Sequence, residues 1–135
     1  MTPTKFVVGS NLMAKMFLAG IGGFVGSILR YSVSGLVQDL SRSIDFPYGT
    51  LAVNLIGCLA IGFLSQLAES RGYFTAETRT LVFIGVLGGF TTFSTFAFET
   101  FELLRDGQFA WAALNIVGQV TAGMLGLWAG YVTAG

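Results

Sequence analysis

The sequence predicts an all-α membrane protein with four transmembrane helices, the third of which is broken. The chain has 135 residues, of which 53% are hydrophobic and only 10% are charged, whereas about 25% of the residues of a soluble domain are charged. A helix that crosses a bilayer needs about 20 mostly apolar residues. Four stretches satisfy this requirement, and because no linker separates them we treat residues 1–135 as one domain with spans at residues 16–37, 49–68, 80–104 and 109–133.

The first predicted helix follows a weakly hydrophobic segment, Met1–Lys15, which carries two lysines. A basic start before an apolar run is also typical of a secretory signal peptide. However, the run from Met16 is longer than the roughly 7–15 residues of a signal core, and no clear Ala-x-Ala cleavage site closes it. We therefore expect this helix to be retained, with residues 1–15 as a tail or an added segment.

The other three predicted helices each follow a short polar connection. Pro47 stands where the second helix should begin, because proline is favoured in the first helical turn. Thr75 is a suitable N-cap for the third helix, and Glu77 places an acidic group in its first turn. The fourth helix should follow a tight turn at residues 105–108.

The third apolar stretch contains an unusual segment at residues 88–96, with the sequence GGFTTFSTF. A glycine inside a helix costs about 1 kcal/mol relative to alanine, and backbone freed by a break must be buried in protein or line water. We expect the glycine pair to interrupt the helix and to free backbone carbonyls, among them those of Gly88 and Thr91, that are suited to a cation. Broken helices of this kind bind ions in transporters.

Phe93 and Phe96 follow the predicted break and lie three residues apart, on one face of the resumed helix. Plain packing is the simpler interpretation of such a pair. An aromatic ring also has a positive edge, which can face an anion without trapping it as a full charge would. Ser94 and Thr95 add hydroxyl groups beside the pair.

A few polar side chains lie within the other predicted helices. Arg30 either snorkels to the membrane surface or makes a vestibule attractive to anions. Asn54 either joins two helices or supplies a hydrogen-bond donor to a pore. Asn115 and Gln119 are four residues apart and share one helix face, which favours a polar track.

Basic residues are distributed almost evenly over the two sides of the predicted bundle. Four lie on the side of the N-terminus, namely Lys5, Lys15, Arg71 and Arg79. Three lie on or near the other side, namely Arg30, Arg42 and Arg105. Because an excess of Lys and Arg normally fixes the orientation, this chain should insert both ways up. Such dual topology makes an antiparallel homodimer possible, and pairs of glycines four residues apart predict close helix packing.

The composition argues against several functional classes. The chain has no histidine and one cysteine, so a zinc site or a nucleophile–base pair has almost no residues to use. We predict that the protein is not an enzyme. Seven basic residues balance seven acidic ones, and without a basic cluster a nucleic acid is not an expected partner.

Three segments of the chain, at residues 22–30, 49–57 and 88–96, together resemble the Fluc (CrcB) family of bacterial fluoride channels. Their sequences are GGFVGSILR, GTLAVNLIG and GGFTTFSTF. The resemblance implies a fluoride-selective passive channel that exports fluoride from the cytoplasm across the bacterial inner (plasma) membrane. It also implies an antiparallel dual-topology homodimer with two pores and a central structural sodium ion, held by the carbonyls of Gly88 and Thr91 from both subunits.

The resemblance also assigns roles to single residues. The pore phenylalanines of the family fall on Phe93 and Phe96, its pore asparagine on Asn54 and its vestibule arginine on Arg30. Ser94 and Thr95 match neighbouring hydroxyl positions. The polar track of the fourth helix falls on Asn115 and Gln119, where some relatives carry Tyr and Ser. The next turn has Gly123, which offers no side-chain donor.

Two other functions remain open on the residues alone. A small proton-coupled exporter of the multidrug type is also a four-helix, dual-topology protein, but it needs a carboxylate within the membrane. Glu99 and Glu102 lie near the end of the third stretch, and the first stretch has no acidic residue. A structural or accessory subunit would explain the packing glycines, although not the segment at residues 88–96.

Overall fold

The computed structural model describes residues 11–135, and every regular element in this range is a helix. In chain order these are α1 (Leu12–Ser41), α2 (Tyr48–Arg71), α3 (Ala76–Arg79), the π-helix η1 (Thr80–Leu87), α4 (Gly88–Phe90), α5 (Phe93–Arg105) and α6 (Phe109–Thr133). The expected tail at residues 1–15 falls largely outside the described residues, and α1 already begins at Leu12.

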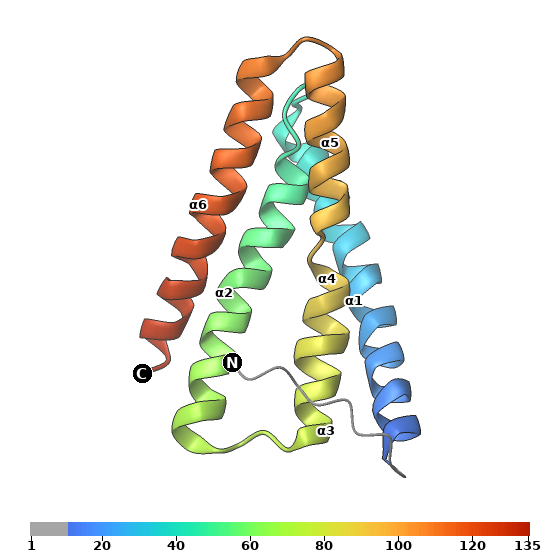
Figure 1. Cartoon of the computed structure of the whole chain (residues 1–135), viewed down its shortest axis with the longest axis vertical. Coiled ribbons are helices and arrows are strands. Elements are labelled where there is room, and N and C mark those ends of the chain that lie inside the picture. Colours follow the sequence, from blue (N-terminus) through green and yellow to red (C-terminus); the bar gives the residue numbers. More distant parts are fainter. Residues whose placement is uncertain (1–10) are drawn as a thin grey trace.

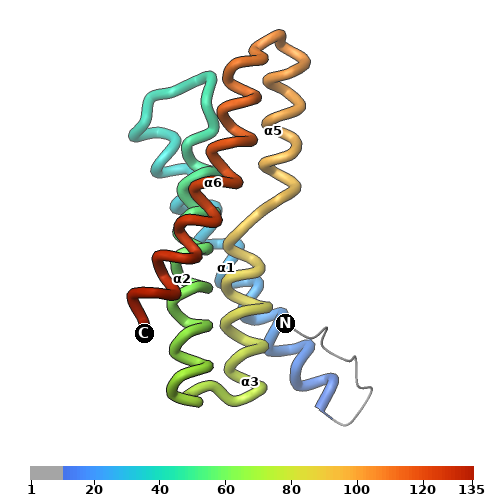
Figure 2. Tube along the Cα trace, turned by 60° about the vertical axis from the view of Figure 1, so that its left-hand side comes forward, coloured from blue at the N-terminus to red at the C-terminus, as the bar shows by residue number. Residues whose placement is uncertain are grey.

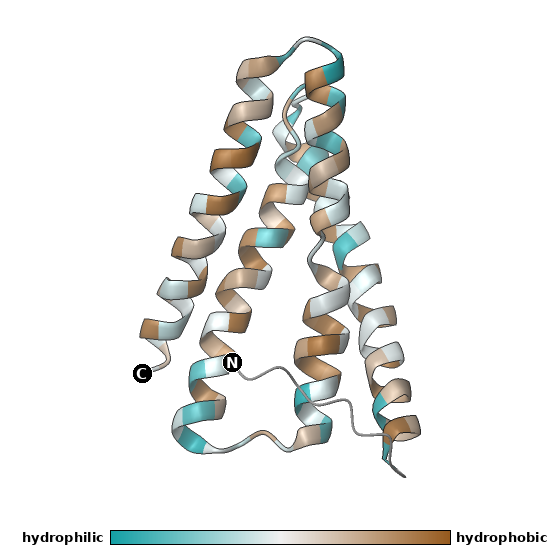
Figure 3. Ribbon diagram, viewed as in Figure 1, coloured by the Kyte–Doolittle hydropathy of each residue, from teal (hydrophilic) through white to brown (hydrophobic). Residues whose placement is uncertain are grey.

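The predicted four-span architecture is confirmed. Four helical stretches are long and apolar enough to cross a membrane, namely Leu12–Ser41, Tyr48–Arg71, Ala76–Arg105 and Phe109–Thr133. The first three extend beyond the predicted apolar stretches, because the helices continue into the polar residues that flank them. We call these four helical stretches rods. Figure 3 shows hydrophobic residues along all four rods, with hydrophilic residues at the turns and at a few positions within the rods.

The outer surface of the bundle is strongly apolar. Phe24 is 69% exposed, Met124 is 66% exposed and Trp128 is 65% exposed. A protein with such a surface would aggregate in water, since soluble monomers rarely expose large contiguous apolar patches. These side chains therefore face lipid or another copy of the chain, as a multi-pass membrane protein requires.

The third rod, which runs from α3 to α5, changes its neighbour halfway along its length. Its first half, η1 and α4, packs against α1, whereas its second half, α5, packs against α6. α2 packs along α6 for most of their length. Figures 1 and 2 show these neighbours from two directions, with α1 beside the lower part of the third rod and α6 beside α5.

Glycines allow α1 and the third rod to approach backbone to backbone. A Cβ atom at Gly26 would overlap the carbonyl oxygen of Val86, and one at Gly22 would overlap the carbonyl oxygen of Leu81. A Cβ at Gly85 would lie 2.8 Å from the Cα of Gly22. The small-residue spacing in the sequence therefore corresponds to an actual helix contact.

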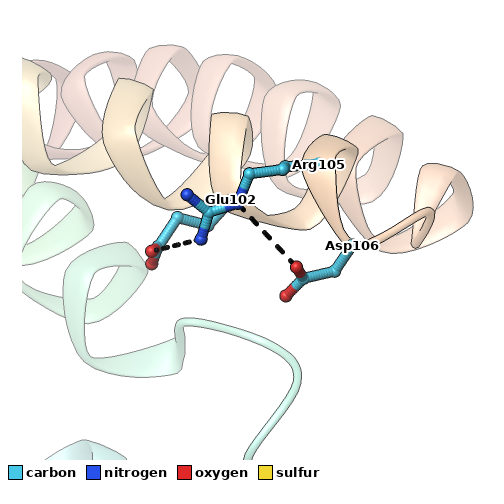
Figure 4. A network of polar contacts seen from close by, with 3 residues as sticks. All are labelled: Glu102, Arg105 and Asp106. Carbon is cyan, nitrogen blue, oxygen red and sulfur yellow. Dashed lines mark hydrogen bonds and ion pairs between the residues drawn. The ribbon is translucent and has the colours of Figure 1, made fainter.

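The connections follow the predicted turn chemistry. Thr75 caps α3 by accepting a hydrogen bond from the Thr78 N–H (3.2 Å), and Glu77 lies in the first turn. The turn between α5 and α6 is shown in Figure 4, where Arg105 lies 3.3 Å from Glu102 and 4.0 Å from Asp106. These groups are well exposed, so the two ion pairs contribute little to stability.

Candidate functional site

The third rod is interrupted by two residues with extended backbone, Thr91 (φ −85°, ψ 157°) and Thr92 (φ −150°, ψ 119°). In Figure 1 they form the thin link between α4 and α5. The prediction placed the interruption at the glycine pair, and this position is wrong, because Gly88 and Gly89 form the start of α4. Gly89 is needed for packing instead, since a Cβ there would lie 2.7 Å from the carbonyl oxygen of Gly23.

The side chain of Asn54, on α2, holds the interruption in place. Its Oδ1 accepts a hydrogen bond from the Thr92 N–H (2.8 Å), and its Nδ2 donates to the Thr92 carbonyl (3.1 Å). Nδ2 also donates to Oε1 of Gln119 on α6 (3.0 Å). One amide therefore connects three of the four rods where the backbone of the third is extended.

The backbone carbonyls of Gly88 and Thr91 are among those that lose their helical donors at the interruption. In a continuous helix the Thr92 N–H would donate to Gly88 and the Thr95 N–H would donate to Thr91. Instead, Thr92 donates to Asn54 and Thr95 donates to the Thr92 hydroxyl (3.2 Å). The carbonyl oxygens of Gly88 and Thr91 are consequently available to another partner.

The two predicted track amides on α6 are both buried, and they use their hydrogen-bonding groups differently. Gln119 is 9% exposed and accepts from Asn54, which leaves its Nε2 without a partner among residues 11–135. Asn115 is 0% exposed and donates to the Thr100 hydroxyl (2.9 Å), which in turn donates to the Phe96 carbonyl (2.8 Å). The Oδ1 of Asn115 has no partner in this range.

The two predicted pore phenylalanines lie side by side at the start of α5. Their ring centroids are 5.6 Å apart and the rings are tilted by 59°. Phe93 is 80% exposed, although Phe96 is half-buried. The predicted hydroxyl residues Ser94 and Thr95 follow Phe93 in the chain, and Thr95 accepts a hydrogen bond from the Thr92 hydroxyl (3.0 Å).

Two cavities flank the interruption, and Thr92 lines both. The smaller, of about 380 Å³, is bordered by most of the predicted pore residues, including Asn54, Phe93, Phe96 and Gln119. The larger, of about 1190 Å³, is lined by Arg30 and by Thr95. No carboxylate lies within ion-pair distance of Arg30 in the described range. Of the predicted site residues, only Ser94 and Asn115 border neither cavity.

Sequence reasoning left Thr50 and Glu99 without a role, and it missed Thr100. The Thr50 hydroxyl donates to Oε1 of Glu99 (2.8 Å), and both residues line the larger cavity. Thr100 is 7% exposed and joins Asn115 to the backbone of α5. Its position four residues after Phe96 was a signal that it lies on the same helix face.

The fold and this site define a class of protein. It is a multi-pass membrane protein whose third helical rod is interrupted by two threonines, Thr91 and Thr92, beside two cavities. Residues 17–131 match a family described as CrcB-like protein, Camphor Resistance (CrcB). The chain belongs to this family, which confirms the resemblance predicted from the sequence.

Named relatives cover nearly the whole chain. It is 43% identical over 122 residues to "Fluoride-specific ion channel FluC 1" of Methanosarcina acetivorans, covering 90% of this chain and 92% of the relative. It is 44% identical to "Fluoride-specific ion channel FluC" of Methylobacillus flagellatus (88% and 93% covered) and 45% identical to the protein of that name from Elusimicrobium minutum (92% and 96% covered). The family is thus one of ion channels, and the prediction that the chain is not an enzyme is confirmed.

Proposed function

We propose that this protein is a fluoride-selective passive channel that exports fluoride from the cytoplasm. The observation that carries the proposal is the lining of the smaller cavity, which combines amide and hydroxyl groups with three phenylalanine rings, those of Phe83, Phe93 and Phe96, and contains no charged side chain. A pore must replace the hydration water of its ion and still release the ion. Neutral donors and positive ring edges suit a small, strongly hydrated anion, and the names of the relatives support fluoride.

Fluoride efflux from liposomes that contain the purified protein tests this function, with chloride as the matched ion. We expect rapid passive fluoride release and little chloride release. A folded protein that releases no fluoride without a proton gradient would instead favour the proton-coupled exporter.

The channel in this proposal is an antiparallel, dual-topology homodimer with two pores. Support comes from Phe93, which lies at the interruption and is 80% exposed in the single chain. A pore-lining ring needs a second wall, and another copy of the chain can supply it. Accessibility of tags at both termini in intact cells tests the topology, and labelling of each tag on one side only would contradict it.

A structural sodium ion at the dimer centre is part of the same proposal. The residues fit such an ion, because the carbonyls of Gly88 and Thr91 lack helical donors and hard cations prefer oxygen ligands. No group of three His, Cys, Asp or Glu side chains gathers in residues 11–135, and the two backbone carbonyls offer oxygen ligands without such a group. The bound ion would fix the interrupted third rods of the two subunits relative to each other.

We predict that Gly57→Ala weakens sodium binding. A Cβ at Gly57 would overlap Cγ2 of Thr91, so the substitution displaces a residue whose carbonyl is a proposed ligand. The measurement is the sodium dependence of thermal unfolding of the purified dimer, since a ligand bound only to the folded state raises its stability. We expect the sodium-dependent rise in Tm to shrink or disappear.

The matched control for this prediction is the double variant with Gly57→Ala and Thr91→Ser. Serine lacks Cγ2 but keeps the hydroxyl that donates to the Leu87 carbonyl (3.0 Å). We expect this variant to regain the sodium dependence. An undiminished sodium effect in Gly57→Ala alone would remove Thr91 from the ligand set.

We also predict that Asn54→Asp reduces fluoride flux. The substitution places a negative charge beside the path of an anion, and it removes the two hydrogen bonds that Nδ2 donates. The measurement is the initial rate of fluoride efflux at equal protein content. An undiminished rate would assign Asn54 to helix packing alone.

A further inference from the structure

We infer that Gln108 is a positioning residue, which holds the carboxylate of Asp45 at the rim of the larger cavity so that its charge does not offset that of Arg30. The inference rests on the proposed channel function and deepens it, because it concerns how fluoride enters the larger cavity. Asp45 lies on the connection between α1 and α2, and Gln108 is the residue before α6. Figures 1 and 2 show this connection and the turn between α5 and α6 at the same end of the bundle.

The larger cavity is lined by more acidic than basic side chains. Arg30 is the one basic residue in its lining among residues 11–135, whereas five carboxylates line it, namely Asp39, Asp45, Glu99, Glu102 and Asp106. A cleft lined by charges of one sign attracts ions of the opposite sign, so these formal charges alone would repel an anion. Admission of fluoride therefore depends on where each carboxylate lies and on what it contacts.

Three of these carboxylates have a partner other than Arg30. The Arg105 guanidinium lies 3.3 Å from Glu102 and 4.0 Å from Asp106, as Figure 4 shows. Glu99 accepts a hydrogen bond from the Thr50 hydroxyl (2.8 Å). The other two carboxylates have no basic partner within ion-pair distance in the described range, namely Asp39 and Asp45.

The Asp45 carboxylate is held by a neutral side chain. Nε2 of Gln108 donates a hydrogen bond to Oδ1 of Asp45 (3.2 Å) and so joins the start of α6 to the connection between α1 and α2. A carboxylate can only accept hydrogen bonds, so the donor of Gln108 favours the side-chain direction that meets it. Asp39 differs, because it lies within α1 and the helix backbone fixes its place.

The backbone that carries Asp45 is held by a different side chain, Gln38 on α1. Nε2 of Gln38 donates to the carbonyls of Ser43 (2.8 Å) and Phe46 (3.1 Å), and its Oε1 accepts from the Gly49 N–H (3.0 Å). Phe46 is also buried, at 4% exposed. Loss of the bond to Asp45 would therefore free the direction of this carboxylate without moving the connection.

A carboxylate released from the rim can turn into the cavity that it lines. The cavity of about 1190 Å³ is comparable in width to the Debye length, which is about 10 Å at 0.1 M salt. A negative charge that enters it is consequently not screened from the ion path and offsets the positive charge of Arg30. Gln108 thus acts on fluoride entry through Asp45 and needs no contact with the ion.

Fluoride efflux from liposomes at low ionic strength tests the inference. Gln108→Met removes the donor and keeps the side-chain length, while the backbone bonds of Gln108 to Leu103 and Ala112 do not involve the amide. We expect its rate to fall about two- to fivefold, the range that the energies of exposed charged pairs correspond to. Adding Asp45→Asn should restore at least the wild-type rate, because no charge is left to hold. A double variant as slow as Gln108→Met, or a wild-type rate in Gln108→Met, would overturn the inference.

The salt dependence of the same rates separates this role from a loss of structure. The Debye length is about 30 Å at 0.01 M salt and about 3 Å at 1 M, so the deficit of Gln108→Met should disappear at the higher concentration. A deficit that is equal at both concentrations would overturn the inference. Gln66→Met makes the same change on α2, outside both cavities, and should keep the wild-type rate. Absence of flux in the wild type, unlike any of these results, would overturn the channel function itself.

Discussion

Phe93→Ile and Phe96→Ile are each expected to abolish the proposed fluoride flux while the proposed homodimer stays intact. Both rings border the smaller cavity, with centroids 5.6 Å apart. Isoleucine is apolar and fills part of the same space, but it lacks the positive ring edge that faces an anion. Because Phe93 is 80% exposed in the single chain, its ring contributes little to the core of the subunit, and the subunit should fold normally.

The measurement is fluoride efflux from liposomes, after size-exclusion chromatography has shown that each variant is dimeric. Phe98→Ile is the matched control, because Phe98 lies on the same helix, is 59% exposed and borders neither cavity. We expect its flux to equal that of the wild type. Rates near the wild-type value in both Phe93→Ile and Phe96→Ile would contradict the assignment of the pore.

Gly26→Ala is expected to destabilise the fold severely. The added Cβ would overlap the carbonyl oxygen of Val86 and would lie 2.9 Å from the backbone nitrogen of Phe90. Both are backbone atoms, so relief requires α1 to move away from η1 and α4. Overpacking typically costs about 1–3 kcal/mol, and the upper end or more is expected here because no flexible side chain can move aside.

The measurement is the free energy of unfolding in detergent micelles, from denaturant titration. Gly20→Ala is the matched control on the same helix, since a Cβ at Gly20 has no heavy atom within 4 Å. Alanine is favoured over glycine inside a helix by about 1 kcal/mol, so Gly20→Ala should be neutral or stabilising. Equal stabilities of the two variants would show that α1 does not pack as described.

The four spans were predictable because their signal is local. Each is a run of apolar residues of membrane length, and the polar connections end at recognisable turn residues such as Thr75 and the segment at residues 105–108. The position of the interruption was not predictable in the same way. Gly88 and Gly89 read as a break from sequence alone, yet the extended residues are Thr91 and Thr92, because Gly89 faces the backbone of α1.

The composition of the candidate site was predictable, whereas its internal connections were not. The segment at residues 88–96 is unusual enough to be noticed, and Asn115 and Gln119 share a face by their spacing alone. The bond between Asn54 and Gln119 joins residues 65 positions apart. No periodicity reveals which N–H of one amide meets which oxygen of another, so the orientation of Gln119 required the packed structure.

The exchange of neighbours along the third rod has a consequence for biosynthesis. α1 packs mainly against η1 and α4, and α2 packs mainly against α6. The hairpin of α1 and α2, which leaves the ribosome first, therefore makes only part of its final contacts. The bundle is completed when the C-terminal helix enters the membrane. Until then the inner face of α2 stays uncovered, and a nascent chain that stops before α6 will present that face to lipid and to quality-control proteases.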